Sequence, residues 1–204
     1  MSRVIMLLFV CSLLATNAFA QTNKELQIEL IQMFQEDQKA RQAFIDSKMQ
    51  DEKLTFKISE IDRRNTTRLK EIVKQYGWPS KTLIGEDGAA IAFLLVQHAD
   101  LNLDFQKECL ILMEELALRN RQEVYLPGIA YLTDRIRIAD KKRQLYGSQV
   151  FIYPQTKEII IYPIEDPDNL EKRRSAYGLP LMKEYVEQIK KAYGITEDLN
   201  LEHQ

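Results

Sequence analysis

Four polar residues stand where the helical pattern of this chain predicts apolar side chains. Asp37 and Arg41 interrupt the apolar stripe of a helix predicted over residues 23–47. Asn65 interrupts the stripe of the second predicted helix, and His98 continues that of the third. A polar group on a core-facing stripe is costly unless it is paired and hydrogen-bonded. We therefore expect the four side chains to share one polar pocket; the alternative is that each is satisfied separately.

His98 is the member of this set best suited to catalysis. An imidazole ordinarily changes charge near neutral pH, so it can both accept and donate a proton. A carboxylate on one ring nitrogen would orient the other nitrogen toward a substrate, and Asp37 or Asp134 is predicted to supply it. His98, Asp37 and Asp134 are therefore the predicted catalytic residues.

The remaining predicted site residues would bind substrate. Arg41 and Arg135 could hold an anion, with Asp134 or Arg135 at the rim of the pocket. Arg174 follows a second arginine, and such a pair is ordinarily solvated, but within a pocket it could hold a carboxylate or a phosphate. The complete predicted binding set is Arg41, Asn65, Arg135, Tyr146, Gln149 and Arg174.

Two functional hypotheses follow from these residues. The first is a metal-independent enzyme, a hydrolase, lyase or transferase, that uses His98 as general acid and base on a small polar or peptide-like substrate. The second is a non-catalytic module of the cell envelope whose pocket binds a peptide, a cell-wall fragment or a small anion. Turnover that depends on His98 would distinguish the two.

Composition and missing motifs narrow these hypotheses. The chain of 204 residues has 28 basic and 30 acidic residues, so no overall positive field attracts nucleic acid, and no nucleic-acid partner is expected. The sequence lacks a serine nucleophile elbow, a metalloprotease helix motif, a phosphate-binding loop and a dinucleotide fingerprint. Only two histidines occur, His98 and His203, and no carboxylate has a cation-loop signature around it. We expect no metal and no cofactor.

The elements that must position these residues are mostly helices. Helical periodicity continues over residues 54–76, and Gly77-Trp78-Pro79 ends it. Glu86-Asp87 is predicted to open a central helix and Asp104 to cap the next. The further predicted helices cover about 105–119, 128–140, 169–177 and 180–193. Residues 149–153 and 158–162 predict a β-hairpin with a four-residue turn. The predicted fold is mainly α, a single helical domain with one β-hairpin near residues 149–162.

Nine short motifs, in order along the chain, resemble a bacterial family known only as a domain of unknown function. The resemblance covers about residues 30–190 and includes the polar residues of the expected pocket. It implies no activity, because the family has none established. The motifs are Asp37-Gln38 with Arg41, Asn65-Thr66 with Arg68-Leu69, Gly77-Trp78-Pro79, Gly85-Glu86-Asp87-Gly88, Gln97-His98-Ala99-Asp100, Tyr131-Leu132-Thr133-Asp134-Arg135, Gln144-Leu145-Tyr146-Gly147-Ser148-Gln149, Pro163-Ile164-Glu165-Asp166, and Arg173-Arg174 with Gly178-Leu179.

The first twenty residues are typical of a cleaved secretory signal. Arg3 is followed by an apolar run over residues 4–15 and then by Ala18-Phe19-Ala20. The run is shorter than the roughly 20 apolar residues of a membrane-spanning helix, so we expect no membrane anchor after cleavage. Val10 is too large to precede a lipid-modified Cys11.

We therefore expect an exported protein, periplasmic or secreted. Residues 1–20 would form the signal peptide, 21–194 a single helical domain and 195–204 a flexible tail. The expected partner is a small-molecule or peptide ligand, and the sequence does not determine the oligomeric state.

Export can be tested directly. Cells that express the full sequence should yield a mature chain that begins at Gln21, because signal peptidase cleaves after a small-x-small motif. Intact-mass measurement of the purified protein checks this. A mass that retains residues 1–20, or one that includes a lipid on Cys11, would contradict the prediction.

Overall fold

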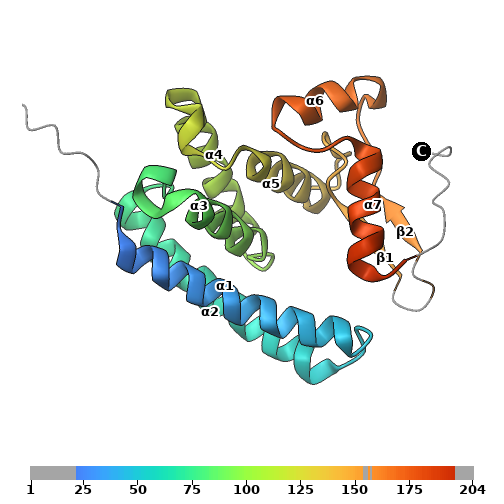
Figure 1. Cartoon of the computed structure of the whole chain (residues 1–204), viewed down its shortest axis with the longest axis horizontal. Coiled ribbons are helices and arrows are strands. Elements are labelled where there is room, and N and C mark those ends of the chain that lie inside the picture. Colours follow the sequence, from blue (N-terminus) through green and yellow to red (C-terminus); the bar gives the residue numbers. More distant parts are fainter. Residues whose placement is uncertain (1–21, 154–155, 157, 196–204) are drawn as a thin grey trace, which may run out of the picture.

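The structure is a computed structural model that describes residues 22–153, 156 and 158–195. Within these residues it is mainly helical with one antiparallel hairpin, which confirms the predicted fold class (Figure 1). The elements are α1 (Lys24–Asp46), α2 (Glu52–Tyr76), α3 (Lys81–Gln97), α4 (Leu103–Arg119), α5 (Leu126–Ala139), β1 (Val150–Ile152), β2 (Ile159–Ile161), α6 (Leu170–Ala176) and α7 (Met182–Tyr193), with short 3-10 turns at Arg121–Glu123 and Pro167–Asn169.

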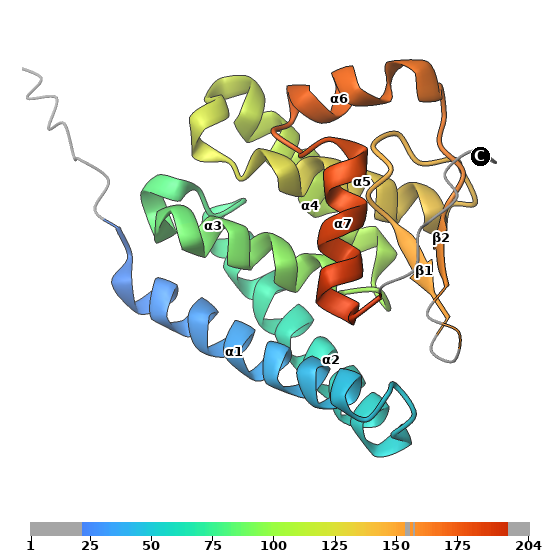
Figure 2. The ribbon, with the colours of Figure 1, turned by 45° about the vertical axis from the view of Figure 1, so that its right-hand side comes forward.

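The two longest helices, α1 and α2, lie side by side, and both pack against α3. Asn23 caps α1 by accepting from the backbone N–H of Leu26, and Asp51 caps α2 in the same way. Gly77 ends α2 with φ of +69°, a conformation that favours glycine. Figure 2 shows this pair running beneath α3, which places one face of each long helix against the same central helix.

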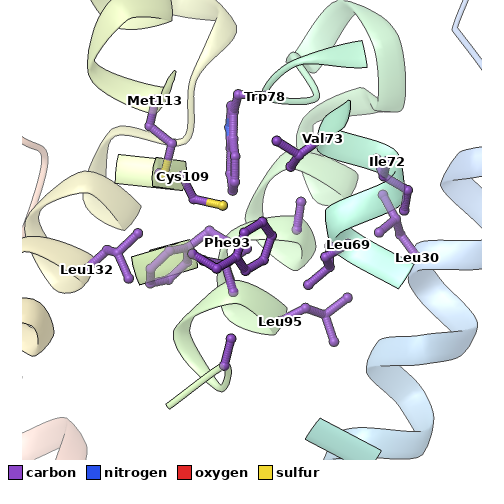
Figure 3. Close-up of a cluster of buried hydrophobic side chains, with 14 of the residues drawn as sticks. Leu30, Leu69, Ile72, Val73, Trp78, Phe93, Leu95, Cys109, Met113 and Leu132 are labelled. Atoms are coloured by element: carbon purple, nitrogen blue, oxygen red, sulfur yellow. The ribbon is translucent and has the colours of Figure 1, made fainter. Parts of the chain in front are cut away.

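The hydrophobic core forms around α3. Figure 3 shows Trp78 and Phe93 between Met113 of α4 on one side and Val73 of α2 on the other. Cys109 is fully buried in the same cluster, and burial raises the pKa of its thiol, as expected for a structural cysteine. Since α3 contacts α1, α2, α4 and α5, one continuous core connects the long helix pair α1 and α2 with α4 and α5.

One predicted helix start is right and one is wrong. The long part of α3 begins at Glu86, as predicted, because Gly85 with φ of +79° interrupts the helix just before it. The sequence analysis missed the short helical piece over residues 81–84, which Ser80 caps by accepting from the Leu83 N–H. The fourth helix has Asn102, not Asp104, at its N-cap position, and the Asn102 side chain accepts from Lys70 instead of capping.

The hairpin lies where the change of periodicity predicted it. Val150 pairs with Ile161 and Ile152 with Ile159. At its base the buried Gln144 side chain donates to the carbonyls of Tyr162, at 2.6 Å, and Gln149, at 3.2 Å. The hairpin is therefore fixed to the preceding loop by an amide as well as by strand pairing.

The loop over residues 144–149 is held between two buried charged side chains. Asp134 of α5 accepts from the backbone N–H groups of Leu145, Tyr146 and Ser148 at 2.6 to 3.1 Å. Arg174 of α6 donates to the Tyr146 carbonyl at 2.5 Å and to that of Pro180 at 2.7 Å. N–H groups of the loop therefore face the negative charge of Asp134, and the Tyr146 carbonyl faces the positive charge of Arg174.

Within the described residues, none of the helices is both long enough and apolar enough to span a membrane. The predicted signal peptide, residues 1–20, and all but the first residue of the predicted tail lie outside the described residues.

Removal of the Asp134 carboxylate should destabilise the fold. Asp134→Ala leaves three backbone N–H groups without their acceptor, so the free energy of unfolding should fall by about 3 kcal/mol. Urea denaturation measures the change. Asp140→Ala, at the exposed end of the same helix, is the matched control and should have a much smaller effect. Equal losses in the two variants would contradict the role of the loop contacts.

Candidate functional site

Asp37, Arg41 and His98 meet at the junction of α1 with the end of α3. Asp37 is 1% exposed, and its carboxylate accepts from Arg41 Nε at 3.0 Å. His98 Nδ1 lies 3.2 Å from Asp37 Oδ1 and 3.1 Å from Oδ2. Three of the four residues in the expected pocket therefore contact one another, and the pairing spans two elements that are distant in sequence.

Asp62 is a member of this cluster that the sequence analysis missed. It lies on α2, and its carboxylate accepts from Arg41 Nη2 at 2.5 Å. Arg41 thus joins a carboxylate on its own helix to one on the neighbouring helix. An acidic residue one turn before Asn65 was the available signal, but charged residues on helices are common and this one interrupts no apolar stripe.

Asn65 is buried as predicted, but no hydrogen bond connects it to His98 or Asp37 in the described part of the chain. Its side-chain Nδ2 is buried without a partner. A buried amide donor without an acceptor is unusual in a folded protein. Asn65 therefore brings an unused donor to the face of α2 that also carries Asp62.

The pKa values of the two carboxylates of the cluster, Asp37 and Asp62, are shifted in opposite directions. Burial favours the neutral form of Asp37, but the hydrogen bond from His98 and the charges of His98 and Arg41 outweigh it, so its pKa lies below the ordinary value. Burial raises the pKa of Asp62, and Arg41 only partly offsets this effect. Asp37 is therefore the permanent anion of the cluster, and Asp62 is the carboxyl group that more readily holds a proton.

His98 itself is oriented by its contact with Asp37. With Nδ1 held by the carboxylate, the other ring nitrogen, Nε2, has no hydrogen-bond partner among the described residues. It is not one of the buried atoms without a partner, so it reaches solvent. The arrangement can move a proton at Nε2 while Asp37 stabilises the positive ring.

Asp37, Asp62 and His98 also have the ligand types of a metal site. One ligand atom from each lies within 4.8 Å of the others. Arg41 donates to both carboxylates, however, and its guanidinium already supplies the positive charge that a metal ion would bring. The donor set fits a cation only if Arg41 leaves, so the geometry favours an arginine-linked pair of carboxylates.

Arg135 forms a second ion pair close to the first. Its guanidinium binds both carboxylate oxygens of Asp100, with Nε to Oδ1 at 2.6 Å, and donates to Gln149 Oε1 at 3.2 Å. Burial tends to raise the pKa of Asp100, but these bonds outweigh burial and lower it, with a smaller contribution from the charge of His98. The predicted residues Arg135 and Gln149 therefore lie together, and their partner Asp100 is close enough to His98 to respond to its charge.

The structure gives Asp134, Tyr146 and Arg174 partners other than the predicted ones. All hydrogen bonds of the Asp134 carboxylate within the described ranges go to the backbone of residues 145–148, so it does not orient His98. Tyr146 is buried with its ring against Tyr177. Arg174 is 1% exposed rather than solvated, and it binds backbone carbonyls. The predicted site is thus divided into a cluster around His98 and a set that fixes the loop.

Opposite pH dependences should identify the two carboxylates of the cluster. The folded-state pKa of Asp37 is below 3.8, so its stabilising contribution is complete above that pH and is lost as pH falls through the folded pKa. The folded-state pKa of Asp62 is above 3.8, so its stabilising contribution is complete below pH 3.8 and is lost as pH rises through the folded pKa. Urea denaturation of wild type, Asp37→Asn and Asp62→Asn, at pH values from below to above 3.8, measures the contributions of both carboxylates. Parallel curves for the two variants would contradict the assignment.

Comparison with known proteins identifies a family but no characterised relative. The model of a family described as a family of unknown function, DUF6624, matches residues 24–198. No curated protein and no solved structure was found to match the chain. The match covers every residue of the cluster around His98, so the site lies within the family domain.

Proposed function

The chain belongs to the DUF6624 family, and we propose that it is an enzyme in which His98 is the general acid and base. The observation that carries the proposal is the pairing of His98 Nδ1 with the buried Asp37 carboxylate. A buried carboxylate on one imidazole nitrogen fixes the tautomer and the ring orientation. It leaves the other nitrogen to exchange protons with a substrate.

Proton transfer at Nε2 is the chemistry that this arrangement supports. When Nε2 takes a proton from a substrate or a water molecule, the ring becomes positive, and the Asp37 carboxylate stabilises it. Asp37 keeps its charge because Arg41 and His98 hold its pKa low. A reaction that needs a base in one step and an acid in the next, such as hydrolysis, elimination or group transfer, fits this cycle.

Arg41 supplies the electrophilic side of the proposed site. Its Nε binds Asp37 and its Nη2 binds Asp62, and Nη1 makes no hydrogen bond to any described residue. The side chain is 28% exposed, so Nη1 reaches solvent. A guanidinium held by two carboxylates is preorganised to bind an anionic group or a developing negative charge.

The alternative proposal is a non-catalytic binding module of the cell envelope. The specific observation in its favour is that Arg41 Nη1 has no acceptor among the described residues, on a side chain that is 28% exposed. Such a donor would bind a peptide carboxylate, a cell-wall fragment or a small anion without any proton transfer. Export to the periplasm or the medium is part of both proposals and rests on the N-terminal sequence.

Substitution of His98 distinguishes the two functions. Purified protein is incubated with mixtures of peptides, cell-wall fragments and polar metabolites, and products are followed by mass spectrometry. His98→Asn should lower turnover by about 10²- to 10⁴-fold, the usual contribution of a general acid or base, without lowering the melting temperature. His203→Asn changes the only other histidine of the chain and is the matched control.

Three outcomes have distinct meanings. Turnover that is lost in His98→Asn and kept in His203→Asn supports the enzyme. Saturable binding in wild type and in both variants, without turnover, supports the binding module. Turnover that survives His98→Asn unchanged overturns the assignment of His98.

A further inference from the structure

A cavity of about 290 Å³ opens beside the cluster around His98. It lies between α3, α5, α7 and the loop over residues 144–149, and Figure 2 shows α7 standing beside α3 and α5. Gln97, the residue before His98, is part of its wall. Its lining residues are Phe93, Leu94, Gln97, Tyr125, Tyr131, Ser148, Gln149 and Tyr185.

The polar groups of this lining are four hydroxyl groups and two amides, and none of its members is charged. The hydroxyl groups of Tyr125 and Tyr131 have no partner in the described part of the chain and are not buried atoms, so solvent reaches them. The Ser148 hydroxyl accepts from Gln149 Nε2 at 3.2 Å, which leaves its own hydrogen to donate. Such a lining favours a ligand that is rich in acceptors.

Arg174 places a positive charge behind this wall. Its guanidinium lies 5.1 Å from the centre of the Tyr185 ring, on the ring face, and Tyr185 lines the cavity. Two of its nitrogens bind backbone carbonyls, but Nη2 is buried and has no hydrogen-bond partner among the described residues. No carboxylate forms a salt bridge with Arg174 within the described residues, whereas the nearby carboxylate of Asp134 has both oxygens occupied by backbone N–H groups.

We infer that this cavity is a binding site for a compact carboxylate. The hydroxyl groups of Tyr125, Tyr131 and Ser148 donate to its oxygens, since that of Tyr185 already donates to the Ser148 carbonyl at 2.7 Å. Arg174 supplies the positive field. Phe93 and Leu94 provide an apolar wall for the rest of the ligand. A phosphate monoester, with nearly two charges, would need more than the single cation that lies behind the wall.

The size of the cavity limits the ligand to about ten non-hydrogen atoms, since a water molecule occupies about 30 Å³ of liquid. Phenylacetate has this size and carries one carboxylate on an apolar ring. Phenylacetamide has the same shape without the charge, and phenyl phosphate carries the other anion. The inference does not depend on chemistry at His98, because binding is measured without turnover.

Calorimetric titration of the purified protein with these three probes tests the site. Phenylacetate should bind about tenfold or more tightly than phenylacetamide, because a charged acceptor makes the stronger hydrogen bonds. Tyr131→Phe removes one lining hydroxyl and should weaken phenylacetate about fivefold. Tyr153→Phe, on the hairpin and outside the cavity lining, is the matched control and should bind like wild type.

A second variant separates this site from the proposed catalytic cluster. His98→Asn should bind phenylacetate as wild type does, whatever its effect on turnover. Equal affinities for phenylacetate and phenylacetamide would overturn the inference, as would no measurable binding of either or tighter binding of phenyl phosphate. Loss of phenylacetate binding in His98→Asn would mean that the ligand binds at the cluster around His98, and it would overturn the inference. Wild-type affinity for phenylacetate in both Tyr131→Phe and Tyr153→Phe would mean that the ligand binds outside the cavity, and it would overturn the inference too.

Discussion

A carboxylate removed from water must find hydrogen-bond donors, and this constraint organises both halves of the molecule. Asp37 and Asp134 are each 1% exposed or less, and they lie on different helices, α1 and α5. Asp37 meets the requirement with side chains, from Arg41 on its own helix and from His98 at the end of α3. Asp134 meets it with backbone N–H groups of one loop. The cost of an unpaired buried charge thus fixes where the long helices and the loop must lie.

The two solutions have different consequences for function. Backbone donors cannot change their charge, so the contacts of Asp134 serve structure alone. The donors to Asp37 include an imidazole, whose other nitrogen is left for a ligand, and a guanidinium with unused hydrogen-bonding capacity. The first carboxylate is therefore part of a site that can respond to a ligand, and the second maintains the wall of the adjacent cavity.

The loop over residues 144–149 connects these two regions. Its Gln149 amide accepts from Arg135, which holds Asp100 beside the cluster around His98. Gly147 has φ of +64°, and a side chain there would meet Ile164 and Met182 at about 3 Å. The loop must therefore keep one conformation, and that conformation presents Ser148 and Gln149 to the cavity.

The sequence by itself determined the helical fold, the hairpin and the burial of two polar groups, Asp37 and Asn65. Periodicity reports local geometry, so apolar stripes located the helices, and the interruptions at Asp37 and Asn65 marked residues that the core encloses. No pattern in the sequence indicated the short helical piece over residues 81–84. Ser80 caps it and Gly85 separates it from the predicted start at Glu86, and a piece of one turn is too short to show an apolar stripe.

Only the tertiary structure decided which polar groups share a site. Asp62 joins the cluster because α2 packs antiparallel to α1 in a register that brings it to Arg41, and no pattern within α2 encodes that register. Asp134 does not contact His98, because its carboxylate binds three backbone N–H groups of the loop over residues 144–149. The position of Asp134 on its helix does not reveal that this loop packs against it. Pairing across elements depends on how whole helices dock, and this is a property of the assembled core rather than of any one segment.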